Sequence, residues 1–186
     1  MESEVLGLIA ALARVLDARG LRWFLFGGQA AVLLGSPRLT LDVDVTVGLD
    51  LESAAGLVEE LAAAGFAARV ENPGAFVADT RVLPLFHGPS GLPVDLVVAG
   101  PGLEEEFLGR ARRVEVSGVS FPLVTAEDFI IMKVLAGRPK DREDVVSVLA
   151  RGAPLDRPYV VEKLRLLEAA LDRGDLRALL ESLDPR

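Results

Sequence analysis

The sequence predicts an α/β (α+β) fold in which a small mixed β-sheet flanked by helices is followed by a helical C-terminal part. Three observations predict it. Short apolar runs with strand-like alternation are interleaved with helical repeats up to about residue 122. From Thr125 onward only helical spacing recurs. The length of 186 residues suits one domain, or one domain with a small helical appendage. We therefore expect an α/β core over residues 1–122 and a helical region over residues 123–186 packed on that core.

The elements of the first half follow from apolar periodicity and from glycine or proline interruptions. Apolar residues at helical spacing predict an opening helix that Gly20 ends. The further helices expected are Gln29–Leu34, Leu51–Ala64 and a turn at Glu104–Leu108. The strands expected are Arg22–Phe26, Leu39–Val47, Phe66–Val70, Phe76–Ala78, Arg81–Phe86, Pro93–Val98 and a hairpin of Arg113–Val116 with Val119–Phe121.

The second half reads as helices throughout. Thr125 is followed three residues later by Asp128, a pattern typical of a helix N-terminus. The helices expected are Phe129–Leu135, Asp141–Ala150, Tyr159–Leu171 and Leu176–Leu183. No internal repeat interrupts this plan.

Composition limits the chemistry that the chain can perform. It contains no cysteine and one histidine, His87, which excludes thiolate nucleophiles, cysteine-ligated zinc and multi-histidine metal cages. Any metal must therefore be held mainly by carboxylates, which select hard ions such as Mg²⁺ or Mn²⁺. The net charge of −8 is uneven: residues 1–109 hold 6 basic and 15 acidic side chains, and residues 110–186 hold 14 and 13.

The N-terminal residues carry acidic and basic side chains without the basic and apolar regions of a signal peptide. No run approaches 18 uncharged apolar residues. We therefore expect a cytoplasmic protein without a membrane partner.

Two carboxylates mark the predicted strand Leu39–Val47. Asp42 and Asp44 are two residues apart, so on a regular strand both point to the same side, about 6–7 Å apart along the backbone. A third carboxylate, Asp95, interrupts the otherwise apolar strand Pro93–Val98. If the two strands are neighbours, Asp95 completes a three-carboxylate cluster suited to two Mg²⁺ ions. Such ions orient a triphosphate and neutralise a leaving pyrophosphate.

Gly27 and Gly28 stand between a predicted strand and a predicted helix. Backbone amides at a helix N-terminus bind phosphate oxygens, and glycine allows a close approach. With Arg38, Thr40, Asp42 and Asp44, these glycines form a motif that resembles the DNA polymerase β-like nucleotidyltransferases, most closely the bacterial abortive-infection type toxins. The six positions agree with that motif in residue type and in spacing over 18 residues.

The resemblance implies a nucleotidyltransferase core, with Asp42, Asp44 and Asp95 as catalytic metal ligands. It also implies that Gly27, Gly28, Arg38 and Thr40 bind the NTP. The segment Ile131–Val145 is similar to the toxins' lysine followed by a basic residue and an aspartate. On that basis Lys133 binds the triphosphate, and Asp141, in preference to Asp144, orients Lys133 or a basic neighbour.

The implied reaction transfers an NMP from an NTP to an acceptor hydroxyl with release of pyrophosphate. The acceptor implied by the toxins is RNA, such as the 3′ end of a tRNA, and the implied partner is a cognate antitoxin protein. Basic clusters at Arg110, Arg112 and Arg113 and at Arg138, Lys140 and Arg142 suit an RNA acceptor. The alternatives are a small-molecule (antibiotic) nucleotidyltransferase and a catalytically silent member of the fold that binds a nucleotide or a protein.

Simpler structural interpretations accompany these assignments. Asp42 and Asp44 also suit a solvated strand face, and Asp95 a strand end. Arg38 also suits an ion pair with the acidic strand without any metal. Lys133 stands among apolar residues, so its stem also suits the rim of a core helix with the ammonium reaching water.

Overall fold

The computed structural model describes residues 2–152 and 154–184 and divides them into two compact units. The first unit comprises the described residues up to Ala30 together with Leu39–Val124. The second comprises Ala31–Arg38 and the described residues from Thr125 onward. Periodicity changes along the chain near residue 123, but it gives no sign that Ala31–Arg38 groups with the later helices.

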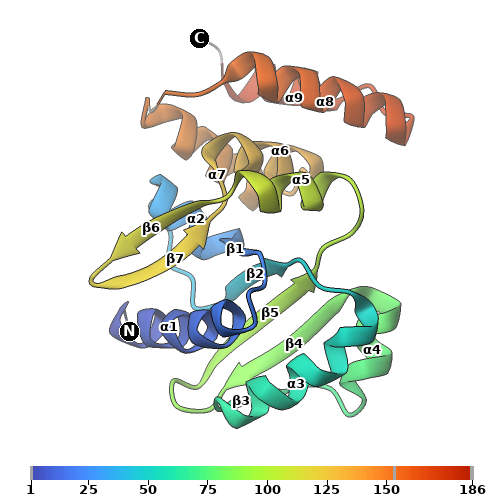
Figure 1. The fold of residues 1–186 in the computed structure, drawn as a ribbon. Coiled ribbons are helices and arrows are strands. Elements are labelled where there is room, and N and C mark those ends of the chain that lie inside the picture. Colours follow the sequence, from blue (N-terminus) through green and yellow to red (C-terminus); the bar gives the residue numbers. More distant parts are fainter. Residues whose placement is uncertain (1, 153, 185–186) are drawn as a thin grey trace. The chain divides into compact units, whose positions relative to one another are not determined.

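One mixed sheet of seven strands forms the centre of the first unit, counted over the described residues (Figure 1). Its spatial order is β3-β4-β5-β2-β1-β7-β6. Two neighbouring pairs, β2 with β5 and β1 with β7, are parallel, and the others are antiparallel. The predicted mixed α/β fold class is therefore confirmed. The strands are β1 (Trp23–Phe26), β2 (Val43–Val47), β3 (Phe66–Ala68), β4 (Val82–His87), β5 (Leu92–Val98), β6 (Arg112–Val116) and β7 (Val119–Leu123).

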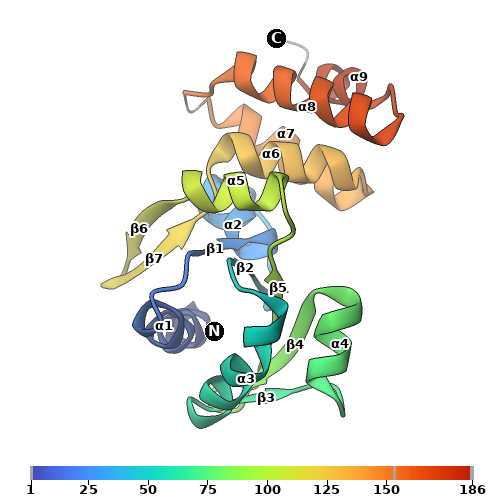
Figure 2. The same ribbon diagram turned by 45° about the vertical axis from the view of Figure 1, so that its right-hand side comes forward.

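Helices of the first unit pack against this sheet. Helix α1 contacts β7, α3 contacts β3, and α4 contacts β4 (Figures 1 and 2). On α1 the residues Leu8, Leu12 and Leu16 recur every fourth position and are fully buried, which is why this amphipathic segment is helical. The helical segments are α1 (Glu2–Ala18), η1 (Leu51–Ser53), α3 (Ala54–Ala63), α4 (Pro73–Thr80) and α5 (Leu103–Arg110). Helix α2 (Gly27–Leu34) begins in the first unit and ends in the second.

The second unit contains the C-terminal helices α6 (Ala126–Ala136), α7 (Pro139–Ala150), α8 (Arg157–Leu171) and α9 (Leu176–Leu183). Thr125 caps α6 as predicted, because its side chain accepts a hydrogen bond from the Asp128 amide at 3.2 Å. Gly137 ends α6 in the left-handed conformation, and Pro139 occupies the first turn of α7. These local signals explain why the sequence gives the positions of these helices well.

The predicted strand Leu39–Val47 is wrong over its first four residues. Strand β2 begins only at Val43, so Asp42 lies outside it, and Leu39 is 89% exposed. The partner strand β1 ends at Phe26, opposite Asp44, and the chain then turns into α2. Residues 39–42 therefore have no strand to pair with on that side, and the alternation of their sequence does not make them a strand.

The predicted strand Phe76–Ala78 is also wrong, because it lies in helix α4. The Asn72 side chain caps this helix by accepting a hydrogen bond from the Ala75 amide at 3.1 Å, and Pro73 stands in the first turn. A three-residue apolar run does not distinguish a strand from a helix. The capping residues Asn72 and Pro73 are the better guide here.

Candidate functional site

A glycine turn brings the end of β1 against the acidic residue of β2. Phe26 is the register partner of Asp44, and Gly27 follows with φ of 65°. A Cβ atom at Gly27 would lie 1.9 Å from Asp44 Oδ2, so only glycine leaves room for this carboxylate. The Gly28 amide donates a long hydrogen bond to Asp44 Oδ2 at 3.4 Å. The sequence motif thus corresponds to a real contact between the turn and the strand.

The close contact between Gly27 and Asp44 predicts how a substitution at Gly27 changes the free energy of unfolding. Gly27→Ala is expected to lower the free energy of unfolding by about 1–2 kcal/mol through its left-handed backbone. It is expected to cost about 1–3 kcal/mol more through overlap with the Asp44 side chain. Gly20→Ala is the matched control, because Gly20 has the same φ of 65° and nothing within 4 Å of the added Cβ. Urea unfolding measures both variants, and equal losses would contradict the packing that we describe.

Thr40 lies against the second glycine of the turn. A Cβ atom at Gly28 would come 2.7 Å from Thr40 Oγ1, and Gln29 Nε2 donates to the Thr40 carbonyl at 2.8 Å. Residues 39–42 are therefore held to the start of α2 at one point, although they form no strand. This places Gly27, Gly28, Thr40 and Asp44 together in the first unit.

Asp44 and Asp95 are direct neighbours across the sheet. They are register partners in the parallel pairing of β2 with β5. Along β5 the even-numbered residues are buried and Asp95 faces the other, partly exposed side, where Asp44 also lies. Neighbouring strands are about 4.8 Å apart, so the two carboxylates are placed side by side. The strands that carry Asp44 and Asp95 are therefore neighbours, which is the condition for the two carboxylates to meet.

The three-carboxylate group expected from the sequence is not assembled. Asp42 precedes β2 and is exposed, so strand geometry does not place it beside Asp44. Over residues 2–152 and 154–184, no three His, Cys, Asp or Glu side chains gather as a metal site. What the structure provides is the pair of Asp44 and Asp95 beside the glycine turn. Their oxygen donors suit a hard divalent cation.

Arg69 is a site residue that the sequence interpretation missed. Its guanidinium makes an ion pair with Asp95 through Nη2 and Oδ1. It follows β3, where its amide donates to the Pro84 carbonyl at 2.9 Å. One arginine after a short strand carries no sequence signal, and only the register of β3, β4 and β5 shows that it reaches Asp95.

A buried ionic cluster lies in the second unit around Lys133. Its ammonium donates to Asp141 Oδ1 and to Asp144 Oδ2, both at 2.8 Å. Lys133 is only 7% exposed, both carboxylates are buried, and Nζ lies 5.3 Å from the centre of the Phe129 ring. The lysine is thus not at the solvent rim of its helix. Both Asp141 and Asp144 accept hydrogen bonds from the Lys133 ammonium, whereas the sequence favoured Asp141 as its partner.

Asp144 also holds the segment Ala31–Arg38. It accepts hydrogen bonds from Ser36 Oγ at 3.0 Å and from Arg38 Nη1 at 2.8 Å. Arg38 therefore has its ion-pair partner on α7, and the interpretation that it pairs with the acidic strand is not what the structure shows. The side chain of Arg38 is 28% exposed.

Asp141 is charged at lower pH than an ordinary aspartate. Burial alone would raise the pKa of its carboxyl group, but hydrogen bonds from Arg138 and Lys133, together with their positive charges, lower that pKa below its usual value. Arg138 binds Asp141 through Nε at 2.5 Å and Nη2 at 3.2 Å. Arg38, Lys133 and Asp141 thus belong to one connected cluster.

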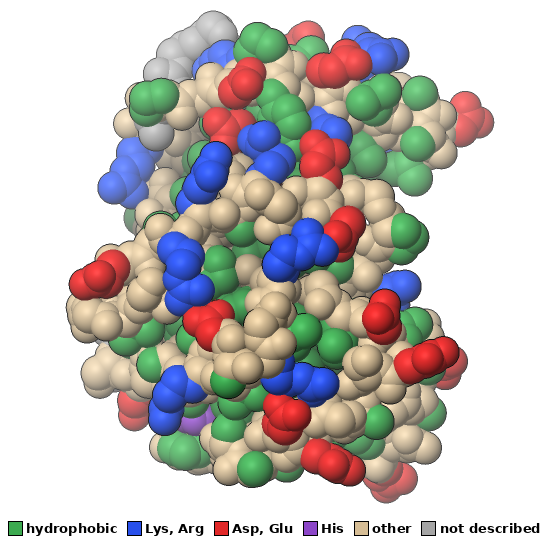
Figure 3. Space-filling model, in the orientation of Figure 1, with side chains coloured by type: hydrophobic (Ala, Val, Ile, Leu, Met, Phe, Trp, Pro, Cys, Tyr) green, Lys and Arg blue, Asp and Glu red, His purple; other side chains and the backbone are tan. Residues whose placement is uncertain are grey.

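The basic clusters of the second half of the sequence are partly engaged within the protein. Arg113 binds Asp17 at 2.9 Å, Arg138 binds Asp141, and Arg142 Nε donates to the Gly137 carbonyl at 3.0 Å. The space-filling view shows basic and acidic side chains interspersed on the face that it draws (Figure 3). These arginines are therefore less available to a polyanion than their number suggests.

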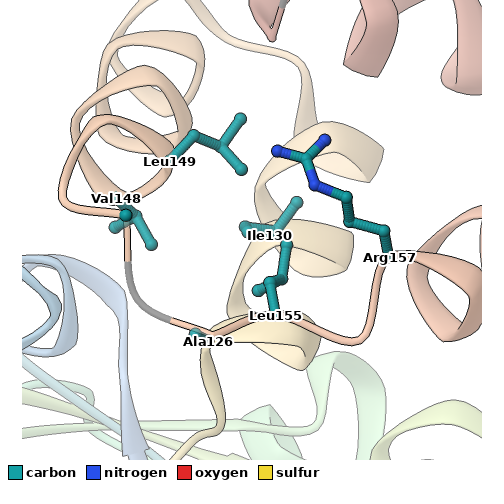
Figure 4. A pocket seen from close by; sticks show the side chains of 7 residues that line it. Ala126, Ile130, Val148, Leu149, Leu155 and Arg157 are labelled. Atoms are coloured by element: carbon teal, nitrogen blue, oxygen red, sulfur yellow. The ribbon is translucent and has the colours of Figure 1, made fainter. Parts of the chain in front are cut away.

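A cavity of about 340 Å³ lies in the second unit between α6, α7 and the start of α8. Figure 4 shows the apolar side chains of Ile130, Val148, Leu149 and Leu155 around it, with Arg157 at one side. Arg157 makes an ion pair with the buried Asp184. None of the predicted site residues lines this cavity, so it is separate from both groups described above.

The fold is that of nucleotidyltransferases, as solved structures with low sequence identity indicate. The antibiotic-resistance factor ANT(2'')-Ia is 16% identical, with a TM-score of 0.63 over 92% of this chain and 97% of that one. An antigenic nucleotidyltransferase-like protein from Paracoccidioides brasiliensis is 18% identical, with a TM-score of 0.58 over 99% and 98%. The lincosamide antibiotic adenylyltransferase LnuA is 12% identical, with a TM-score of 0.54 over 80% and 96%.

The chain belongs to a family described as nucleotidyltransferases of unknown function (DUF6036), whose model matches residues 4–162. It is therefore a nucleotidyltransferase, as the glycine and aspartate motif predicted. No curated protein sequence matches this chain significantly. Among the helices described, none is both long and apolar enough to cross a membrane.

Proposed function

We propose that this nucleotidyltransferase transfers an NMP from an NTP to an acceptor hydroxyl with the help of Mg²⁺ or Mn²⁺. The observation that carries the proposal is the side-by-side placement of Asp44 and Asp95 next to the Gly27–Gly28 turn. In the reaction the acceptor oxygen bonds to the α-phosphorus, and the bond from that phosphorus to the pyrophosphate oxygen breaks. The acceptor hydroxyl gives up its proton with the help of Asp95, which would accept it directly or through water, and pyrophosphate is released.

The carboxylates and the turn divide the work in this proposal. Asp44 and Asp95 would hold the cation, which would supply positive charge to the triphosphate and to the leaving pyrophosphate. Asp42, exposed in the segment before β2, is not placed beside them. Asp95 also helps to deprotonate the acceptor hydroxyl. The Gly27 and Gly28 amides approach the phosphates at the positive end of α2.

Arg38 and Lys133 are the cations that the family resemblance assigns to the NTP. Lys133 is buried and already donates to two carboxylates, so binding a phosphate would require breaking ion pairs. Arg38 is more exposed and donates to Asp144 through one terminal nitrogen, which leaves the rest of its fork in place for an anion. We therefore favour Arg38 over Lys133 as the residue that binds the triphosphate. Thr40, which the resemblance also assigns to the NTP, lies two residues further along the chain.

Two classes of acceptor are candidates, and each has its own support. An RNA or tRNA acceptor, with the chain acting as a toxin that a cognate antitoxin protein restrains, rests on the toxin-like motif and on the basic clusters of the second half of the sequence. A small-molecule acceptor is favoured by the ion pairs that occupy Arg113 and Arg138. It is also favoured by the fold shared with a structure of ANT(2")-Ia in complex with adenylyl-2"-tobramycin, at a TM-score of 0.57.

The test is transfer of label from each α-labelled NTP in the presence of Mg²⁺. One set of reactions contains total RNA, and a second contains aminoglycosides and lincosamides. We expect label on one acceptor class, and we expect removal of the cation with excess chelator to abolish it. Transfer that survives chelation contradicts the proposed metal dependence. Binding of an NTP without transfer to any acceptor would instead indicate a catalytically silent member of the fold.

A further inference from the structure

A row of side chains crosses the sheet from its edge to the candidate site. The Arg69 amide pairs with the Pro84 carbonyl, Pro84 is the register partner of Asp95, and Asp95 is the register partner of Asp44. Pro84, Asp95 and Asp44 therefore lie on neighbouring strands and on one face of the sheet, and Arg69 follows directly after β3, beside Pro84. A basic side chain and two acidic ones stand in line there, separated only by a proline.

Pro84 explains why Arg69 reaches Asp95. Its ring has no charged or long group to fill the space between the outer strand and β5, so the arginine side chain crosses β4 to the carboxylate. The ion pair is accessible to water, since the side chain of Arg69 is 39% exposed and that of Asp95 is 43% exposed. Exposed pairs contribute little to stability, so the guanidinium can leave Asp95 at a small cost.

The pairing also answers an electrostatic need. Asp44 and Asp95 are two like charges on adjacent strands, an arrangement that is unfavourable unless a positive charge is close. Arg69 supplies that charge to Asp95 from the side that faces away from Asp44. A divalent cation between the two carboxylates would supply the same charge more strongly, so the arginine and the cation have the same partner.

We propose that Arg69 is a positioning residue of the metal site, where it serves as the resident counter-ion of Asp95 and competes with the divalent cation for that carboxylate. The inference rests on the proposed function, because it takes Asp44 and Asp95 as metal ligands. The competition weakens cation binding in the absence of nucleotide. It also keeps the Asp95 carboxylate pointing along the row before the cation arrives.

Titration of the nucleotide-free protein with Mn²⁺ tests the competition without any assay of activity. The loss of the EPR signal of free Mn²⁺ measures binding. Arg69→Met is expected to lower the Kd for Mn²⁺ about two- to fivefold, the range that follows from the strength of an exposed ion pair. Arg69→Lys keeps the charge, so its Kd is expected to lie near that of the wild type. Arg22→Met is the matched control, because Arg22 forms a comparably exposed ion pair with Glu105 in the same unit.

The outcomes separate this inference from the proposed function. Tighter Mn²⁺ binding by Arg69→Met alone supports the competition. Equal or weaker binding by Arg69→Met, with measurable binding by the wild type, overturns the role of Arg69 and leaves the metal site standing. If neither protein binds Mn²⁺, or if Asp44→Asn leaves Mn²⁺ binding unchanged, the metal site and the inference both fail.

Discussion

Asp44→Asn is expected to lower kcat/KM for NMP transfer about 10²- to 10³-fold, because an amide cannot supply the negative charge that holds the cation at the developing pyrophosphate. Its size and shape match those of aspartate, so the contact with the glycine turn is kept. Asp44 lies against Gly27 and beside Asp95, and no other carboxylate has both neighbours in the part of the chain that the structure describes. The measurement is steady-state release of pyrophosphate at fixed Mg²⁺.

Asp79→Asn is the control for the loss of one acidic charge from the first unit. Asp79 is exposed on α4, and its substitution is expected to leave kcat/KM within about twofold, in line with the small effects of surface changes. The thermal midpoints of both variants should stay near that of the wild type. A fully active Asp44→Asn protein would remove this carboxylate from the mechanism.

Lys133→Met is expected to lower the free energy of unfolding by about 3–5 kcal/mol, because it leaves the buried carboxylates of Asp141 and Asp144 without their shared ammonium. Methionine keeps the apolar stem, so the loss reports the charge more than the packing. Lys140→Met on the exposed side of α7 is the control, with an expected change within about 0.5 kcal/mol. Denaturant unfolding followed by circular dichroism measures both, and equal small changes would show that the cluster is not stabilising.

Acid sensitivity follows from the same cluster. The pKa of Asp141 is lower in the folded protein than in the unfolded chain, so the stabilisation is fully present above the unfolded value of about 4. It is lost as the pH falls through the lower, folded value. Unfolding free energies measured below pH 4 should therefore decline in the wild type. They should decline less in Lys133→Met, where Asp141 has lost one of its two cationic partners.

The sequence predicted the parts of the site that depend on local geometry. Gly27 was expected to let backbone amides approach a phosphate, and the structure shows the Asp44 carboxylate packed against it. Asp95 interrupted an apolar strand, and its partial exposure and its ion pair with Arg69 explain why a charge is tolerated there. Thr125, Gly137 and Pro139 each act within a few residues of their own position, so the ends of α6 and the start of α7 were readable.

Contacts between distant parts of the chain were not readable in this way. Ser36 and Arg38 meet Asp144 across 108 and 106 residues, and no periodicity links them. Residues 39–42 alternate like a strand but lack a partner, because β1 ends opposite Asp44. Arg69 reaches Asp95 through the register of three strands. Pattern along the chain thus gave the identity of most candidate residues, and sheet pairing gave their neighbours.

The position of the transferred phosphorus tests the central claim most directly. Parallel reactions with α-labelled and γ-labelled NTP, Mg²⁺ and the responsive acceptor would be compared, with Asp44→Asn as the background. Our account predicts that the α-label becomes attached to the acceptor while the γ-label appears only in pyrophosphate. Attachment of the γ-label, with release of a nucleoside diphosphate, would contradict nucleotidyl transfer at the Asp44–Asp95 site.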